Sequence, residues 1–432
     1  MTKTEDSKKY KVVTLGCRTN QYESQAYADQ LKELGYTAAG EGENAEVCIV
    51  NTCTVTEAAD TQSRYEVRQL ARKHPNAKLV VTGCAAENNP DQIKTMAGVT
   101  HLVSNKNKEN LIAELFPLET TPEFQIKNFD SHTRAFVKVQ DGCNSYCTYC
   151  IIPYVRGRSR SRTLIEIITE VEGLVATGYK EVVITGINVG DFDGNVPEGN
   201  KAYTLADLIR AVDSVKGLAR LRVSSIDPDE VTEDLASAIL DGKTTCHSMH
   251  IVLQSGSNVI LKRMNRKYTR QIFMDTVDRL RAADPDFTFT TDIIVGFPGE
   301  TDADFKDTLD VMDKVKFAKV HMFPFSERAR TRAALMPNKV PGDVIKARKQ
   351  EVLRFAEKIS YELHERFVGR TMDVLLENKQ EGLCLSMEGH TENFLRVLVE
   401  GEALASNSIV KVKFISNTPQ GLVGVITPVS AE

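Results

Sequence analysis

The sequence predicts an α/β protein of three units: an N-terminal parallel α/β domain, a partial (β/α)6 barrel and a small C-terminal antiparallel β-barrel. Three observations predict this fold. Apolar runs of strand length alternate with polar helical stretches over residues 8–128, and six further strand–helix repeats occupy residues 129–365. Only short strands separated by turns remain in residues 366–430. A chain of 432 residues is long enough for several separate cores.

In the N-terminal unit, the apolar runs KVVTLG, EVCIVN, KLVVTG and HLVS predict the strands of a parallel sheet. Cys17, Cys53 and Cys84 directly follow the first three runs, about one βα unit apart. Because the carboxyl ends of parallel strands share one edge of a sheet, we expect these thiols to meet there. The alternative is three unrelated buried cysteines, which is what we expect of Cys48 inside EVCIVN.

The middle unit has six strand patterns, AFVKVQ, EVVITGI, RLRVSSI, MHIVLQ, FTFTTDIIVGF and KVHMFPF, and a charged helical stretch follows them. Six βα repeats in succession are typical of a partial version of the eight-stranded barrel. Cys143, Cys147 and Cys150 lie in DGCNSYCTYC, directly after the first of these strands. We therefore expect them at the carboxyl-end rim, where barrel active sites lie.

Three thiols within eight residues indicate a metal centre, and IIPYVRGRSR behind them supplies no further Cys or His. A closed zinc site needs four protein ligands, so a site with one open position suits a 4Fe-4S cluster with an exposed iron better. Two alternatives are cysteines that are close by chance and a redox pair formed by Cys147 and Cys150. Cys246 and Cys384 have no partner in spacing and are expected to be structural.

The bulk composition constrains where the protein works. The start MTKTEDSKKY is polar and has no apolar run that resembles a signal peptide, so we expect the nine cysteines to lie in a reducing cytoplasm and to serve as ligand thiols rather than form disulfides. No run of eighteen apolar residues predicts a membrane span. The net charge of −5 offers no global attraction for nucleic acid, and from residue 366 onward six Lys or Arg face eight Asp or Glu. RNA binding must therefore depend on local basic runs, shape and stacking.

The Cys-x3-Cys-x2-Cys spacing, with Tyr149 before the last cysteine, resembles the radical S-adenosylmethionine (radical SAM) enzymes. The ordered set GCRTNQYES, NTCTVT, VVTGC, DGCNSYCTYCIIPYVRG, LQSGS and DIIVGFPGET resembles the radical SAM methylthiotransferases over essentially the whole chain. That resemblance implies a methylthiotransferase domain with an auxiliary cluster, a radical SAM partial barrel and a TRAM barrel that contacts RNA.

The resemblance also implies the cofactors, which are SAM and two 4Fe-4S clusters. Cys143, Cys147 and Cys150 would hold the cluster whose open iron chelates SAM and splits it to a 5′-deoxyadenosyl radical. Cys17, Cys53 and Cys84 would hold an auxiliary cluster that carries the donated sulfur. No side chain is implied as a general acid or base. The implied partners are a tRNA anticodon stem-loop and an electron donor such as flavodoxin or ferredoxin.

Within the family, TLGCRTNQYES, SSID and IIPYVRGRSRSR resemble the branch that converts threonylcarbamoyl-adenosine, 3′ of the anticodon, to its 2-methylthio derivative. A sibling branch acts on isopentenyl-adenosine, and another acts on an aspartate of a ribosomal protein. An alternative of another class is a non-catalytic iron–sulfur RNA-binding or sensor protein. A sensor needs one cluster, usually with four ligands, so the two open triads disfavour it.

Polar and small residues at the strand ends are candidates for SAM binding, with ordinary turn chemistry as the alternative for each. These candidates are Tyr149, Gly186, Asn188, Ser224, Gln254 and Asp292. Asn20 and Asn51 flank the auxiliary cysteines and are expected either to bond cluster sulfurs or to hold turns.

Two basic runs without acids, residues 153–162 and 262–270, are expected to contact phosphates. The candidates for RNA contact are Arg156, Arg158, Arg160, Arg266, Lys267 and Arg330. Arg330 lies in SERART, where the family commonly has glycine. Since arginine enters positive φ at a cost, either this turn differs or Arg330 contacts substrate.

Overall fold

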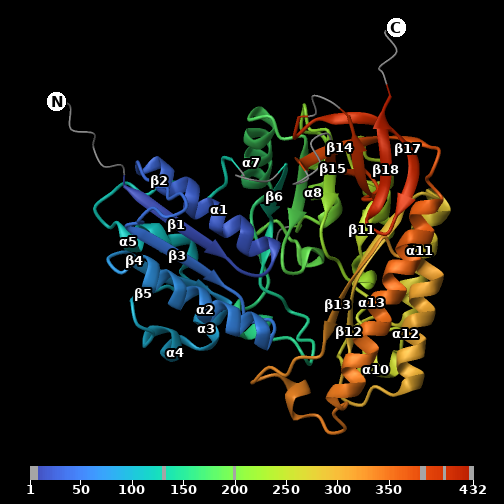
Figure 1. Cartoon of the computed structure of the whole chain (residues 1–432), viewed down its shortest axis with the longest axis horizontal. Coiled ribbons are helices and arrows are strands. Elements are labelled where there is room, and N and C mark those ends of the chain that lie inside the picture. The colour runs from blue at the N-terminus through green and yellow to red at the C-terminus, as the bar shows by residue number, and fades with distance from the viewer. Residues whose placement is uncertain (1–7, 129–132, 198–200, 380–385, 402–404, 428–432) are drawn as a thin grey trace.

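The computed structural model describes residues 8–128, 133–197, 201–379, 386–401 and 405–427. Figure 1 shows three units: the N-terminal sheet at the left, the middle barrel, and a small barrel at the upper right. The predicted fold class is confirmed, whereas the predicted bounds of the units remain a prediction. The expectation for Cys384 falls outside the described residues.

The N-terminal sheet is parallel throughout, in the order β2-β1-β3-β4-β5. Its strands are β1 (Lys9–Thr14), β2 (Thr37–Ala38), β3 (Val47–Thr52), β4 (Lys78–Gly83) and β5 (Val99–Leu102). The four predicted strands are present, and the sequence pattern missed only the two-residue edge strand β2. β3 is buried along its whole length, as a strand with helices on both faces must be.

Helices cover both faces of this sheet. They are α1 (Arg18–Glu33), α2 (Glu57–Lys73), α3 (Cys84–Asn88), α4 (Pro90–Lys94) and α5 (Leu111–Leu115), with a 3₁₀ turn over Lys108–Asn110. Leu31 of α1 and Ile112 of α5 pack in one core with Ile49 of β3. Val67 of α2 packs in a second core with Val50, on the opposite face of the same strand. Because side chains alternate along β3, they contribute to two separate cores, one beneath each layer of helices.

The middle unit is a six-stranded parallel partial barrel, as predicted. Its strands are β6 (Arg134–Lys138), β9 (Glu181–Thr185), β10 (Arg220–Val223), β11 (Ser248–His250), β12 (Thr288–Val295) and β13 (Lys319–Pro324). They form two three-stranded groups, β10-β9-β6 and β11-β12-β13, which isolated parallel bridges such as Ile226 with Ile251 connect. Among the described strands, β6 and β13 have no further barrel neighbour, so the barrel is open between them.

The barrel helices begin where the sequence supplies caps. The long ones are α7 (Leu164–Ala176), α8 (Leu205–Asp213), α9 (Glu233–Leu240), α11 (Arg270–Ala283), α12 (Asp302–Val315) and α13 (Gly342–Glu365). The short elements are β7 (Gln140–Asp141), α6 (Ile152–Val155), β8 (Arg160–Ser161), α10 (Asn258–Arg263) and 3₁₀ turns over Val189–Asp191, Pro228–Glu230 and Arg332–Leu335. Thr163 with Glu166, and Thr301 with Asp304, form capping boxes that satisfy the first amides of α7 and α12.

The C-terminal unit is a closed barrel in the order β14-β15-β16-β18-β17. Its strands are β14 (Thr371–Lys379), β15 (Ser386–Thr391), β16 (Arg396–Glu400), β17 (Ile409–Thr418) and β18 (Gly421–Ile426). The expectation of a purely antiparallel barrel needs a correction, because β16 and β18 pair in parallel. β18 therefore lies between two strands: it pairs in parallel with β16 on one side and antiparallel with β17 on the other. The parallel pair closes the barrel.

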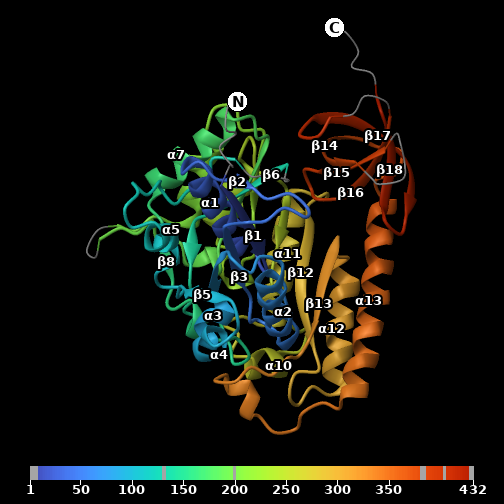
Figure 2. The same ribbon diagram turned by 60° about the vertical axis from the view of Figure 1, so that its left-hand side comes forward.

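The small barrel packs on the amino ends of the middle strands, away from the rim that carries Cys143. Arg220 at the start of β10 donates to the carbonyl oxygens of His390 and Asp373, at 3.0 and 2.8 Å. Arg134 at the start of β6 pairs with Glu377 at 3.1 Å. Figure 2 shows the long helix α13 along the outer side of the middle barrel, with its upper end below the small barrel. None of the described helices is both long and apolar enough to cross a bilayer.

Candidate functional site

The topology brings the three N-terminal cysteines to one edge. Cys17 caps α1, Cys53 follows β3, and Cys84 opens α3 after β4. Gly16 has φ of +91°, and a Cβ there would lie 2.8 Å from Cys53 Sγ, so only glycine fits beside this thiol. Burial raises the pKa of the Cys53 thiol to about 12, and the neighbouring Cys84 and Cys17 sulfurs add to the shift.

The Cys143 loop is anchored at the carboxyl-end rim of the barrel. Its three thiols are half-buried, and the amide of Ser145 donates to Cys143 Sγ at 3.4 Å. The backbone N–H of Thr148 donates to the Met264 carbonyl at 2.9 Å, which ties the loop to the end of α10. Burial, followed by the nearby Cys147, raises the pKa of Cys150 to about 12.

A positive charge lies directly on this triad. Arg266 Nη1 is 3.0 Å from Cys147 Sγ, while Nη2 pairs with Asp227. The guanidinium also lies 4.8 Å from the ring centre of Tyr268. Arg266 therefore stabilises negative charge on the sulfur that it contacts.

Each triad offers three thiols, the ligand type that 4Fe-4S clusters use. Across the described residues, no three His, Cys, Asp or Glu side chains converge in the way that ligands of one metal ion do. The thiolates around a 4Fe-4S cluster bind different iron atoms, so they need not converge on one point. Each triad also lacks a nearby fourth cysteine in the sequence, which fits a cluster with one open position.

The two triads share a wall. Ile151 and Val155, which follow Cys150, pack against Cys84 in one buried apolar cluster. Asn105 Nδ2 donates to the Val155 carbonyl at 2.7 Å and lies 3.8 Å from Cys84 Sγ. The segment behind one set of thiols thus forms the packing surface of the other.

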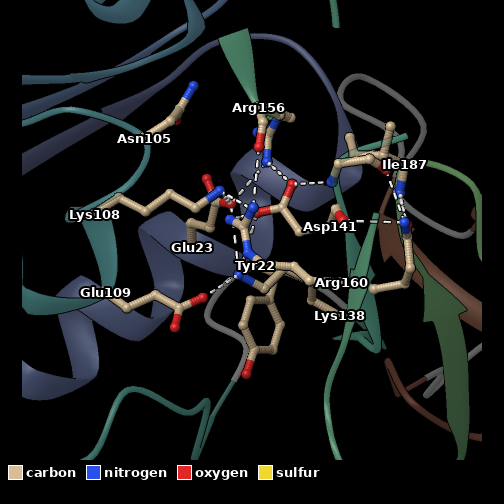
Figure 3. A network of polar contacts seen from close by, with 12 residues as sticks. Tyr22, Glu23, Asn105, Lys108, Glu109, Lys138, Asp141, Arg156, Arg160 and Ile187 are labelled. Carbon is tan, nitrogen blue, oxygen red and sulfur yellow. Dashed lines mark hydrogen bonds and ion pairs between the residues drawn. The ribbon is translucent and has the colours of Figure 1, made fainter. Parts of the chain in front are cut away.

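A buried ionic network holds the two cysteine loops together, as Figure 3 shows. Arg156 Nη1 lies 3.1 Å from Glu23 of α1 and 2.8 Å from Asp141, just before Cys143. Lys108 Nζ lies 2.5 Å from both carboxylates. Burial alone would favour protonated Glu23, but the charges of Arg156 and Lys108 outweigh it and lower its pKa to about 2. The network therefore stays ionised and fixes α1 against the Cys143 loop.

A pocket of about 180 Å³ opens beside Cys150 and is also lined by Val55 and Thr56, which follow Cys53. The lining residues come from both units and are Val55, Thr56, Tyr149, Cys150, Ile151, Ile152, Gln254, Asp292, Ile294 and Phe323–Ser326. Arg328, just beyond Ser326, donates to Thr54 at 2.7 Å and pairs with Asp60. The last strand of the barrel is thereby anchored beside Cys53.

Three of the six candidate SAM residues line this pocket, namely Tyr149, Gln254 and Asp292. Gln254 is buried with φ of +60°, and its Oε1 has no hydrogen-bond partner among the described residues. Strained backbone and an unpaired polar atom at a pocket wall are typical of a ligand contact.

The other three candidates lie outside the pocket lining. Gly186 approaches Gln140, where a Cβ would lie 3.0 Å from Oε1. Asn188 donates to Glu230 at 2.9 Å. Ser224 is buried, and its Oγ finds no partner in the part of the chain that the structure describes. All six SAM contacts remain predictions.

The comparisons with known proteins agree with this architecture. Residues 137–312 match the model of the radical SAM superfamily, and residues 9–104 match an uncharacterized protein family named UPF0004. A curated protein of Chlamydia pneumoniae, threonylcarbamoyladenosine tRNA methylthiotransferase MtaB, is 49% identical over 99% of this chain and 100% of its own length. The chain belongs to the radical SAM methylthiotransferase family.

Other proteins resemble this chain at lower sequence identity. The MtaB protein of Bacillus subtilis is 34% identical over 93% of this chain and 92% of its own. A tRNA-2-methylthio-N(6)-dimethylallyladenosine synthase of Acetivibrio thermocellus is also 34% identical, over 95% and 89%. The solved structure of the radical SAM methyltransferase TsrM from Kitasatospora setae shares the fold, with a TM-score of 0.57, 13% identity and coverage of 76% and 77%. The family implies an enzyme that uses SAM and a 4Fe-4S cluster.

Two of the six predicted RNA contacts are engaged inside the protein. Arg156 is buried in the ionic network. The half-buried Arg266 contacts Cys147 and pairs with Asp227. Both assignments to RNA remain predictions. Arg158 and Lys267 are exposed, as is Arg160, which also pairs with Asp141 at 2.9 Å. These three remain candidates for RNA contact.

Arg330 takes the conformation that glycine would take. Its φ is +74°, so the turn keeps its left-handed geometry despite the side chain. The exposed guanidinium lies 5.2 Å from the ring centre of Tyr154, beside the Cys143 loop. Of the two sequence-based alternatives, a different turn is wrong, and contact with substrate remains a prediction.

The two asparagines that flank the auxiliary cysteines hold turns. Asn20 Nδ2 donates to the carbonyls of Leu15 and Thr52 at 2.6 and 3.0 Å, and Asn51 Nδ2 donates to the Asn20 carbonyl at 3.1 Å. The nearest approach to a thiol is 3.8 Å, from Asn20 Oδ1 to Cys17 Sγ. Cys48 and Cys246 are buried, as structural cysteines are.

Sequence reasoning missed the residues that join the units. Arg328 lies within SERART, so its place in a motif was a usable signal. Asn105 and Lys108 carry no local signal, because their partners come from distant segments.

Proposed function

We propose that this enzyme converts threonylcarbamoyl-adenosine, 3′ of the anticodon in tRNA, to its 2-methylthio derivative, using SAM and two 4Fe-4S clusters. One observation carries the proposal. Residues next to Cys53 and residues next to Cys150 line the same pocket, so one bound base can face both metal centres. The 49% identity to a protein named for this reaction supports the choice of base.

The cysteines fit the two clusters that the reaction needs. Cys143, Cys147 and Cys150 would hold the cluster that binds SAM, and Cys17, Cys53 and Cys84 would hold the auxiliary cluster. When bound, the clusters and SAM supply the radical that removes the hydrogen of adenine carbon 2 and the methylated sulfur that replaces it. The protein provides no acid or base for this bond, because no side chain activates an aromatic C–H.

The chain's own residues hold the reactants and exclude water. Ile151, Ile294 and Phe325 give the pocket apolar walls, which protect a radical from solvent. Gln254 and Asp292 add polar groups that orient a nucleoside. The target adenine must leave the anticodon-loop stack to enter the pocket. Exposed Arg158 and Lys267, on loops near the Cys143 rim, would then contact the loop phosphates.

The enzyme also needs an electron source and a reducing compartment. We expect a small electron donor such as flavodoxin or ferredoxin, working in the cytoplasm. The thiols support this placement, since all eight cysteines in the described residues are free.

The test uses anaerobically reconstituted enzyme, SAM, a chemical reductant and three anticodon stem-loops. The stem-loops carry threonylcarbamoyl-adenosine, isopentenyl-adenosine or unmodified adenosine at the same position. Mass spectrometry of the nucleosides should show the 2-methylthio product from the first substrate alone. Product from the isopentenyl substrate alone would move the enzyme to the sibling branch, whose Acetivibrio member is 34% identical. Absence of product with all three would reject methylthiolation of RNA.

A further inference from the structure

Two cations without a charged partner among the described residues lie on the open side of the barrel, between β6 and β13. Arg18 follows Cys17, and its guanidinium lies 5.5 Å from the ring centre of Phe136 on β6. Lys319 begins β13, the strand at the other border of the opening. Within the described ranges, neither side chain makes a hydrogen bond or an ion pair, although each of the surrounding arginines does.

The nearby carboxylates are already engaged. Glu377 pairs with Arg134 at 3.1 Å, and Glu181 pairs with Arg222 at 2.9 Å. Arg396, which also faces Lys319, is paired with Glu388. Asp292 faces His250, with Nε2 3.4 Å from Oδ1. No described carboxylate is therefore left within ion-pair distance of Arg18 or Lys319.

This arrangement leaves the half-buried Arg18 and the exposed Lys319 without a compensating charge among the described residues. Burial lowers the pKa of Lys319, and the positive charges of Arg396, Arg18 and Arg134 lower it further. Partly buried like charges destabilise one another unless an anion lies between them. The opening therefore carries positive charge that no described carboxylate neutralises, as a binding site for an anion would.

The cations are also connected to the pocket. Lys319, His321 and Phe323 alternate along β13, so they share one face of the strand. Phe323 lines the pocket, and the His321 ring lies 5.8 Å from that of His250, whose Nε2 faces Asp292. At about 3.3 Å per residue, Lys319 begins roughly 13 Å from Phe323 along this face.

We propose that Arg18 and Lys319 form an anion subsite for the carboxylate of the amino-acid substituent on the target adenosine. The inference rests on the proposed function. The threonylcarbamoyl group carries its carboxylate on an arm attached to N6. Carbon 6, which bears N6, and carbon 2 both flank N1 of the purine, so their outward bonds diverge to different sides of the base. With carbon 2 toward the clusters, the arm leaves the base sideways, and β13 borders the pocket on a side that it can reach. A guanidinium with an ammonium group matches a carboxylate, and an isopentenyl group has no charge to offer them.

The test removes the positive charge of each proposed enzyme residue and the negative charge of the nucleoside carboxylate. The enzyme variants are Arg18→Gln and Lys319→Met, with Lys314→Met on the exposed face of α12 as the matched control. The two stem-loops carry threonylcarbamoyl-adenosine or the same nucleoside with its carboxylate converted to a neutral methylamide. Fluorescence anisotropy with reconstituted enzyme gives the Kd of each stem-loop, and single-turnover assays give the methylthiolation rate.

We expect wild-type enzyme and Lys314→Met to bind the acid at least about tenfold more tightly than the amide, the effect of one charge-assisted contact. In Arg18→Gln and Lys319→Met this ratio should fall toward one, because binding of the acid weakens. Iron content, measured on every variant, shows whether Arg18→Gln disturbs the adjacent Cys17. If Arg18→Gln has lost iron, the test relies on Lys319→Met, whose preference for the acid over the amide should fall toward one.

Three results would overturn the subsite. Equal weakening of acid, amide and unmodified stem-loops would assign the cations to backbone phosphates. A changed affinity for SAM in the absence of RNA would assign them to its carboxylate. A wild-type ratio of one would show that the carboxylate is not read at all. Each of these leaves the proposed function intact, whereas absence of methylthiolation of both stem-loops by wild-type enzyme would reject the function and the subsite together.

Discussion

Arg156, six residues beyond the last cysteine of the barrel triad, places its Nη1 3.1 Å from the carboxylate of Glu23, six residues beyond Cys17. Both side chains are fully buried. One ion pair therefore couples the loop of the first triad to the helix that begins at the second. The position of the two cysteine triads relative to each other depends on this pair and on its neighbours Asp141 and Lys108.

Removing this cation should be severely destabilising. In Arg156→Met, Glu23 and Asp141 lose their strongest partner, and breaking a buried pair costs about 3–5 kcal/mol. Arg158→Met, two residues away and exposed, should change the free energy of unfolding by less than about 0.5 kcal/mol. Urea unfolding of the two variants, followed by circular dichroism, measures the difference. Equal stabilities would show that the network does not hold the loops.

Arg266→Met should lower the reduction potential of the cluster on the barrel triad. The variant loses the hydrogen bond to Cys147 Sγ and a positive charge, and it leaves Asp227 unpaired nearby. A hydrogen bond of about 1 kcal/mol corresponds to roughly 40 mV for a one-electron couple. An anaerobic redox titration followed by electron paramagnetic resonance gives the potential. Lys267→Met is the control, and an unchanged or higher potential in Arg266→Met would contradict the assigned contact.

Glu230 should make stability depend on pH. Burial raises its pKa to about 7, above its ordinary value, so the folded protein holds a proton that the unfolded chain has released. The resulting stabilisation is present at low pH and is lost as the pH rises toward 7. Glu230→Gln mimics the protonated form and should raise the melting temperature relative to wild type at pH 8, with the gap closing at pH 5. A gap that is constant, or larger at pH 5, would refute the assignment.

Arg330→Gly tests whether this arginine contacts RNA. Glycine relieves a left-handed φ that costs other residues about 1–2 kcal/mol, but it adds chain entropy to the unfolded state and removes the contact with Tyr154. These effects nearly cancel, so the melting temperature should change little. The affinity for the stem-loop should fall, and the slope of log K against log salt should decrease by about 1. An unchanged salt dependence would remove Arg330 from the RNA interface.

Local patterns were sufficient for the strands and for the grouping of the cysteines. An apolar run such as EVCIVN reports burial on both faces, and the parallel topology then brings Cys17, Cys53 and Cys84 to one edge. The parallel pairing of β16 with β18 could not be predicted, because strand direction within a closed barrel depends on the crossover rather than on the strand sequences.

The basic runs show where sequence reasoning fails. Arg156 and Arg158 look equivalent in a run without acids, yet one is buried and the other exposed. The difference arises from Glu23, a carboxylate on another unit that the fold brings to Arg156. The contacts of Arg266 were missed for the same reason, since Asp227 and Cys147 are distant in sequence.

The most direct test of two clusters in this enzyme is the number of iron atoms bound per chain. Anaerobically reconstituted wild-type enzyme should hold about eight iron atoms per chain, and the Cys17→Ala, Cys53→Ala, Cys84→Ala triple variant about four. The variant should still cleave SAM but form no methylthiolated nucleoside. Four irons in the wild-type enzyme, or loss of SAM cleavage in a folded triple variant, would contradict two separate clusters facing one pocket.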